Sequence, residues 1–146
     1  RYQASTKKWS IIKKNLNIPS FTDTKCQPGT HYKYIVTSQN QARTSNILST
    51  ATKPNKPVIK SLKKSGRKLK LKWKKCKADS IEIFIKTGKD KFKKVATKKG
   101  NATSYKTKKL KKKKYTIKLR AVMKIYKSKK LYSSYSKQKR ADFKTK

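Results

Sequence analysis

The segment Tyr115-Thr-Ile-Lys-Leu-Arg-Ala-Val122 gives the clearest indication of the fold of this 146-residue chain. Its residues alternate, and four of them share one side: Tyr115, Ile117, Leu119 and Ala121. Because successive side chains of a strand point to opposite faces, this alternation predicts a strand with one buried face. Leu110 lies five residues before Tyr115, across a turn of lysines. A tyrosine placed in this way predicts a core strand of a sandwich, with the hydroxyl bonded back to the corner.

Six further segments of residues 57–146 also read as strands. They are 57–62, 68–74, 80–86, 91–97, 103–107 and a last one over about 131–143. The side chains expected to point inward include Leu69, Leu71, Trp73, Ile81, Ile83 and Ile85. Turn signals recur every 8–12 residues or so, as a sandwich requires, and no segment has helical periodicity. The expected fold class is therefore all-β, an immunoglobulin-like β-sandwich.

The charge of the chain is strongly one-sided, with 45 Lys and Arg residues against 5 Asp and Glu residues and a formal net charge of +40. Hydrophobic content is 33%. Such a balance is typical of disordered chains, but here the apolar residues fall in alternating runs with lysines between them. The sequence therefore predicts a folded β protein with a lysine-coated exterior. No apolar run approaches the ~20 residues of a membrane span, so none is expected.

An internal repeat organises the N-terminal third of the chain. Residues 8–12 match residues 91–95 at an offset of 83, and residues 31–36 match residues 114–119, so that Tyr32 is the counterpart of Tyr115. We therefore expect residues 1–52 to be the C-terminal part of a first unit, 53–56 a proline-stiffened linker, and 57–146 a complete second unit. The first two strands of the first unit are missing. Half a sandwich cannot bury its inner face, so we expect about thirty or more upstream residues, or another chain, to complete it.

Several residues together resemble a fibronectin type III domain: Pro57, Trp73, Ile81-Glu-Ile83, Tyr105, Leu110, Tyr115-Thr-Ile-Lys-Leu-Arg-Ala121, Ser133 and Ser136. The segment from Trp73 to Ile83 is similar to domains found in tandem in bacterial cell-surface proteins. The resemblance covers residues 57–146 fully and 1–52 in part. It implies a spacer, adhesion or scaffold role next to neighbouring domains of the same chain, and an extracellular location at the cell surface or cell wall.

The residue types that usually carry catalysis do not form a set in this sequence. Cys26 and Cys76 fall in different units, which favours two small apolar side chains packed in separate cores over a disulfide. His31 has no carboxylate or Cys-His partner in the sequence, and the five acids are not paired. There is no zinc-ligand spacing and no glycine-rich phosphate loop. We therefore expect no enzyme activity, no metal and no cofactor.

The lysines are the strongest candidates for a binding site. Residues 57–146 hold 35 of the 45 basic residues. The predicted polyanion-binding residues form a corner run and a basic loop: Lys108, Lys109, Lys111, Lys112, Lys113 and Lys114, then Lys124, Lys127, Lys129 and Lys130. Lysine acts as a point charge and recognises planar groups less specifically than arginine does. This composition favours loose binding to a phosphate-rich polymer; a solvated face that keeps the protein soluble is the compatible alternative.

Three functions remain open at this stage. The first is a non-catalytic extracellular module in a tandem array that contacts an anionic polymer similar to wall teichoic acid. The alternative is sequence-independent nucleic-acid binding through the basic surface, with Tyr126, Tyr132 and Tyr135 as the candidate stacking residues. The third is adhesion to another protein through the loop from Lys124 to Lys130.

Overall fold

The computed structural model describes residues 1–38, 40, 42–125 and 129–143, and these residues form twelve strands and no helix. The strands are β1 (Tyr2–Gln3), β2 (Lys8–Trp9), β3 (His31–Tyr34), β4 (Leu48–Ala51), β5 (Ile59–Ser65), β6 (Lys68–Trp73), β7 (Ser80–Thr87), β8 (Lys93–Lys99), β9 (Ser104–Lys106), β10 (Lys114–Lys124), β11 (Lys130–Tyr132) and β12 (Lys139–Asp142). A search of the same residues finds no apolar helix of membrane-spanning length.

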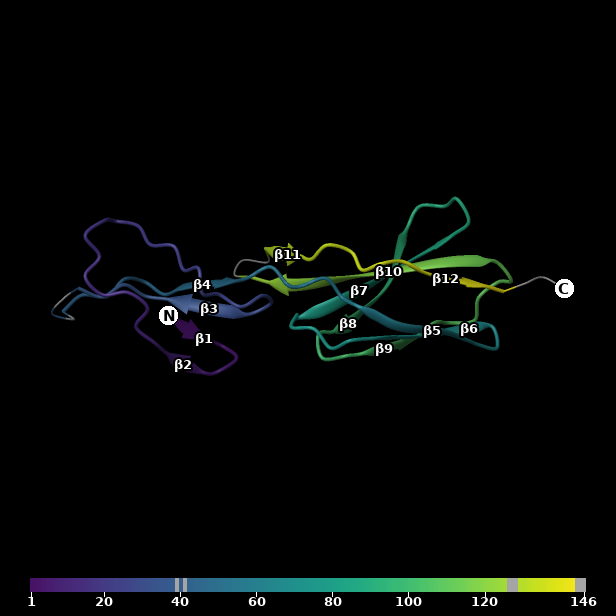
Figure 1. The fold of residues 1–146 in the computed structure, drawn as a ribbon, viewed down its shortest axis with the longest axis horizontal. Coiled ribbons are helices and arrows are strands. Elements are labelled where there is room, and N and C mark those ends of the chain that lie inside the picture. Colours follow the sequence, from purple (N-terminus) through teal and green to yellow (C-terminus); the bar gives the residue numbers. More distant parts are fainter. Residues whose placement is uncertain (39, 41, 126–128, 144–146) are drawn as a thin grey trace.

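The first four strands form a sheet of their own, in the order β2-β1-β3-β4. In this sheet β1 pairs with both β2 and β3, as β7 pairs with both β8 and β10 further along the chain. Figure 1 shows β1 to β4 at one end of the molecule and β5 to β12 at the other. Eight of the twelve large apolar side chains that are most exposed belong to residues 9–48, so much of the apolar surface of this segment is left uncovered by the described residues.

Strands β5 to β12 form two facing sheets. One has the order β5-β6-β9, and the other has the order β11-β10-β7-β8 with β12 also paired to β10. The core between them contains Leu69, Leu71 and Trp73 from β6 and three isoleucines from β7. It is completed by Tyr115, Ile117, Leu119 and Ala121 of β10, each at most 6% exposed. The predicted β-sandwich and its inward-facing residues are thus confirmed.

The lysines occupy the outward positions, as the alternation predicts. On β6, Lys68, Lys70 and Lys72 are exposed while the residues between them are buried. The strand can therefore bury three large apolar side chains and keep every ammonium group in water. Val122 of β10 departs from this arrangement, since it lies on the outward face and is still only 2% exposed.

The last strand expected from the sequence, over about 131–143, is wrong as a continuous element. It is divided into β11 and β12, and residues 133–138 between them have no strand assignment. Two serine hydroxyls explain the break. Ser133 accepts a hydrogen bond at Oγ from the Ala121 amide, and Ser136 Oγ accepts one from the Leu119 amide, both at 2.9 Å. The backbone amides of β10 that face the break therefore still have hydrogen-bond acceptors, although the backbone pairing between the strands is interrupted.

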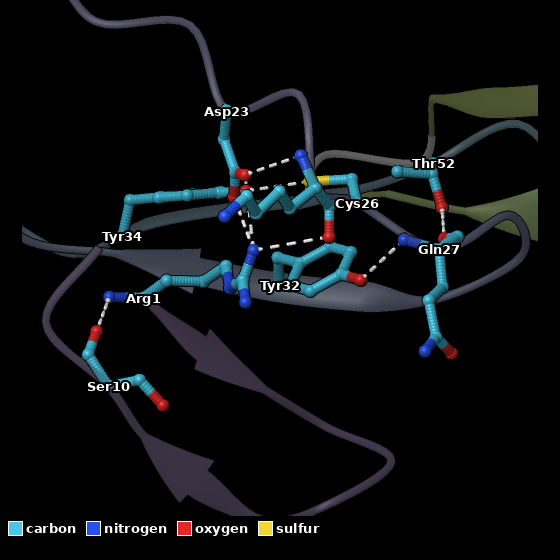
Figure 2. A network of polar contacts seen from close by, with 9 residues as sticks. Arg1, Ser10, Asp23, Cys26, Gln27, Tyr32, Tyr34 and Thr52 are labelled. Carbon is cyan, nitrogen blue, oxygen red and sulfur yellow. Dashed lines mark hydrogen bonds and ion pairs between the residues drawn. The ribbon is translucent and has the colours of Figure 1, made fainter. Parts of the chain in front are cut away.

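The tyrosine hydroxyl of the corner bonds as predicted. Tyr115 donates from its hydroxyl to the Lys111 carbonyl at 3.1 Å. Tyr32, its counterpart in the repeat, is 1% exposed and accepts a 2.8 Å hydrogen bond from the Gln27 amide (Figure 2). Both rings therefore tie a strand to the chain that leads into it.

The core between the two facing sheets is apolar, whereas the first sheet contains a polar network, which Figure 2 shows. The Arg1 guanidinium bonds to both Asp23 oxygens at 2.8 and 3.1 Å, and Tyr34 donates to the same carboxylate at 2.9 Å. Burial raises the pKa of Asp23, but these hydrogen bonds outweigh it and lower that pKa to about 2.

Cys26 lies 3.2 Å from the Tyr34 hydroxyl and is a free thiol in this polar network, so the apolar packing expected for it is wrong. Cys76, also a free thiol, packs against the sandwich core as expected.

Removal of the corner hydrogen bond should destabilise the sandwich. We expect Tyr115→Phe to lower the free energy of unfolding by roughly 0.5–1.5 kcal/mol, the usual net contribution of one such bond. Denaturant unfolding monitored by tryptophan fluorescence measures this difference. Tyr105→Phe, on β9 and away from the corner, is the matched control and should change the free energy less. Equal effects of the two substitutions would contradict a special role for the corner.

Candidate functional site

Nine of the ten lysines predicted to bind polyanions belong to the described residues, and they fall into two groups at opposite ends of β10. Six of them, from Lys108 to Lys114, lie in the corner between β9 and β10 or at the first residue of β10. Lys124 is the last residue of β10, Lys129 lies just before β11, and Lys130 is its first residue. Lys127 lies outside the described residues, as does Tyr126. With a rise of about 3.3 Å per residue, the ten steps from Lys114 to Lys124 separate the two groups by ~33 Å.

The group at the C-terminal end of β10 borders a surface hollow of about 390 Å³. Its lining comes from four strands and the residue before β7: Asp79, Ser80, Glu82, Lys94, Thr97, Lys98, Lys99, Val122, Lys124 and Lys130. We call this the basic hollow. The antiparallel pairing brings Ser80 beside both Lys99 and Val122, and Lys124 beside Lys130, so lysines from β8 and β10 meet there. Five ammonium groups in one concavity favour an anionic occupant.

Three of these lysines, on β8, were missed from the sequence: Lys94, Lys98 and Lys99. They stand in a chain where lysine is common in almost every strand and turn, so the local pattern does not distinguish them. Their proximity to Lys124 depends on the order of strands in the sheet, since β7 lies between β8 and β10. Neither the corner run nor the basic loop would have indicated them.

Glu82, one of two carboxylates in the basic hollow, is held by two cations. Arg120 donates to its Oε2 from Nη2 at 2.7 Å and from Nε at 3.0 Å, and Lys94 Nζ donates to its Oε1 at 3.1 Å. Burial of this 7%-exposed residue raises its pKa, but the hydrogen bonds from Arg120 and Lys94 outweigh burial and hold the pKa below its usual value. The negative charge of Glu82 is thus already compensated within the protein.

Asp79, the other carboxylate, connects the basic hollow with the first sheet. His31 Nε2 on β3 lies 2.9 and 3.1 Å from the two Asp79 oxygens, and the Lys124 amide donates to Asp79 Oδ2 at 2.7 Å. Nearby, Gly29 has a φ of +62°, and a Cβ added to it would lie 2.1 Å from the Lys77 carbonyl oxygen. His31, expected to be an isolated surface residue, therefore pairs with a carboxylate 48 residues away in the sequence.

The outward face of β7 and β10 carries aromatic rings between its cations. Lys118 Nζ lies 3.5 Å from the centroid of the Tyr135 ring and 4.2 Å from that of Phe92. The Arg120 guanidinium lies 4.1 Å from the centroid of Tyr132. Burial first, and then the positive charges of Arg120 and Lys86, lower the pKa of Lys118. These cation–π contacts hold both side chains close to the sheet.

No catalytic constellation is brought together among the residues that the structure describes. They contain no group of three or more His, Cys, Asp or Glu side chains arranged to hold a metal ion. The histidine, His31, pairs with Asp79, and Asp79 also accepts a hydrogen bond from the Lys124 backbone amide. No serine or cysteine side chain takes part in these hydrogen bonds. What this surface offers is positive charge, one concavity and exposed tyrosine rings.

Known proteins show the same fold at low sequence identity. The FN1–FN3 domains of chicken contactin, CNTN1, are 18% identical to this chain, with a TM-score of 0.53 over 86% of this chain and 45% of that one. A β-1,2-glucanase from Parabacteroides distasonis is 22% identical, with a TM-score of 0.52 over 64% of this chain and 13% of that one. The structure of FN3tt mut is 21% identical, with a TM-score of 0.47 over 63% of this chain and 98% of that one.

The match with the contactin FN domains, at a TM-score of 0.53, confirms the resemblance at the level of the fold, which is that of a fibronectin type III-like β-sandwich. No protein-family model matches the sequence, and no curated protein is significantly similar to it. The chain spans 45% of the contactin structure and 13% of the glucanase structure.

The compensated charge of Glu82 should be visible in the pH dependence of stability. Because its pKa is lowered in the folded state, its contribution is fully present above the ordinary value of 4.5 and is lost as the pH falls through the lower folded pKa. We expect Glu82→Gln to reduce the free energy of unfolding by about 1–3 kcal/mol at neutral pH. The gap to the unsubstituted protein should narrow below pH 4.5.

Denaturant unfolding from pH 7 down to acid conditions measures this gap. Asp142→Asn is the control, because Asp142 is half exposed and its closest approach to Lys114 is 3.8 Å. A gap for Glu82→Gln that stays constant with pH would contradict the lowered pKa.

Proposed function

We propose that this chain, a fibronectin type III-like β-sandwich, is a non-catalytic structural or adhesion module of the cell surface that contacts an anionic polymer of the cell wall. The observation that carries this proposal is the basic hollow, where five lysines from three strands line one concavity whose carboxylates already have partners within the protein. Such a site attracts negative charge and has no group prepared for chemistry on it.

The kind of cation supports a phosphate-rich polymer. The hollow is lined by lysines and no arginine, and Arg120 beside it is bound to Glu82. Lysine offers a mobile point charge that follows irregular phosphates, whereas a planar guanidinium favours fixed bidentate contacts. A polymer such as wall teichoic acid presents repeated phosphates of that kind.

The arrangement of the sheets supports a tandem architecture. The pairing of β1 with β2 and β3 parallels that of β7 with β8 and β10, as two successive units of one type would produce. In this proposal residues 1–52 belong to one unit, 53–56 are the linker, and 57–146 are the next unit. The contacts of His31 with Asp79 and of Gly29 with Lys77 then set the angle between them. A neighbouring domain of the same chain, including a catalytic one, would make this module an appendage.

Nucleic-acid binding remains the second candidate, because Tyr132 and Tyr135 are each 40% exposed beside basic residues. Bases stack on such rings in proteins that bind single strands. Both rings, however, are already engaged by Lys118 and Arg120 of the same chain. Because these rings are engaged, we favour the anionic cell-wall polymer over a nucleic acid as the partner.

Salt-dependent binding to purified wall teichoic acid tests the proposal. Two variants each remove three charges: Lys99→Gln, Lys124→Gln and Lys130→Gln in the basic hollow, and Lys68→Gln, Lys70→Gln and Lys72→Gln on the opposite sheet. We expect the first to weaken binding roughly ten-fold or more at low salt and the second several-fold less, because local phosphate contacts add to the general attraction. Binding titrations at several salt concentrations measure both affinities.

The outcome distinguishes the two candidates. No binding of the unsubstituted protein at low salt, or equal losses in the two variants, would contradict a polymer site at the basic hollow. Tyr132→Ala should leave the teichoic acid affinity nearly unchanged. A loss of about 1–3 kcal/mol in the affinity of Tyr132→Ala for single-stranded DNA would favour nucleic-acid binding as the function.

A further inference from the structure

Strand β10 connects the two groups of basic residues through its outward face. Its inward residues are buried in the core, so the alternation places Lys114, Lys118, Arg120 and Lys124 on the other side. Lys114 adjoins the corner run, and Lys124 lines the basic hollow. The cations thus follow one another along a single strand from one group to the other.

We propose that this face is one continuous track for a linear polyanion, anchored at the corner run and at the basic hollow. The inference rests on the proposed function and adds that the bound polymer must have a minimum length. Because the anchors are ~33 Å apart, a phosphate chain shorter than that span can occupy only one of them. The partner is therefore an extended polymer of phosphates and not a small phosphate ester.

The middle of the track guides the polymer and does not repel it. Glu82 is the acidic side chain beside it on β7, and its charge is compensated by Arg120 and Lys94. Lys118 is held between two rings, with its ammonium nitrogen 3.5 Å from the Tyr135 centroid and 4.2 Å from the Phe92 centroid.

The two ends differ from the middle in the freedom of their lysines. Lys114 and Lys124 are exposed, as are Lys111, Lys112 and Lys113 in the corner. Exposed lysines can adjust to the spacing of the phosphates, whereas Lys118 and Arg120 are held by rings and by Glu82. Binding strength should thus come mainly from the two ends.

Occupation of both ends by one chain makes the second contact intramolecular. The effective concentration of the free segment then replaces its concentration in solution, which raises affinity by roughly 10²–10⁴ when the chain can reach both sites. A chain too short to reach gains nothing of this kind. Affinity should therefore rise in a step, and not in proportion to the number of phosphates.

Linear polyphosphates of defined length, from about half to about twice the ~33 Å span, test this inference on the full chain. For the unsubstituted protein we expect a rise in affinity of at least ten-fold beyond proportionality once the contour length passes the span. A corner variant with Lys111→Gln, Lys112→Gln and Lys113→Gln should lose the step and still bind short chains at the basic hollow. The variant Lys68→Gln, Lys70→Gln, Lys72→Gln removes equal charge from the other sheet and should keep the step.

The path is tested separately by acylation of lysine amines, read out by mass spectrometry. A long polyphosphate should protect Lys118 together with Lys114 and Lys124, and a short one should leave Lys118 reactive. A smooth rise of affinity with length, a step that survives in the corner variant, or an unprotected Lys118 would each overturn the track while leaving polymer binding intact. Failure of every length to bind would overturn the proposed function as well.

Discussion

The alternation of side chains along β10 is the constraint on which the rest of the structure depends. One set of residues must be apolar, because it faces β6 across the core, and the register with β7 fixes which residues those are. The other set then faces outward as a consequence. The same strand that closes the hydrophobic core therefore also aligns the cations that we assign to polymer binding.

This dual role explains how a chain with a net charge of +40 can remain folded. The charges lie on the outer faces, where water and counter-ions screen them, and the buried carboxylate Glu82 is bound by Arg120 and Lys94. Local concentration of charge at the corner and the hollow still favours an anion there. Stability and binding are thus linked, because a bound polyanion would relieve the repulsion among the lysines.

The N-terminal segment differs from the sandwich in how its apolar side chains are covered. Ile11 and Ile18, between β2 and β3, and Leu48 of β4 are exposed, and polar contacts among Arg1, Asp23 and Tyr34 occupy part of the surface of the first sheet. In the sandwich, the sheet that contains β7, β8 and β10 is covered by β5, β6 and β9. The difference lies in what packs against the strands, since their pairing order is the same.

The all-β class, the inward residues of β6, β7 and β10 and the tyrosine corner could be predicted from the sequence, because a period of two and a turn are local properties. The break between β11 and β12 could not, since it depends on hydrogen bonds from β10 to Ser133 and Ser136. Nor could the approach of Lys98 and Lys99 to Lys124, or of His31 to Asp79. Alternation tells which side of a strand a residue occupies, but its neighbours across the sheet depend on strand order and register, which arise only when the whole chain packs.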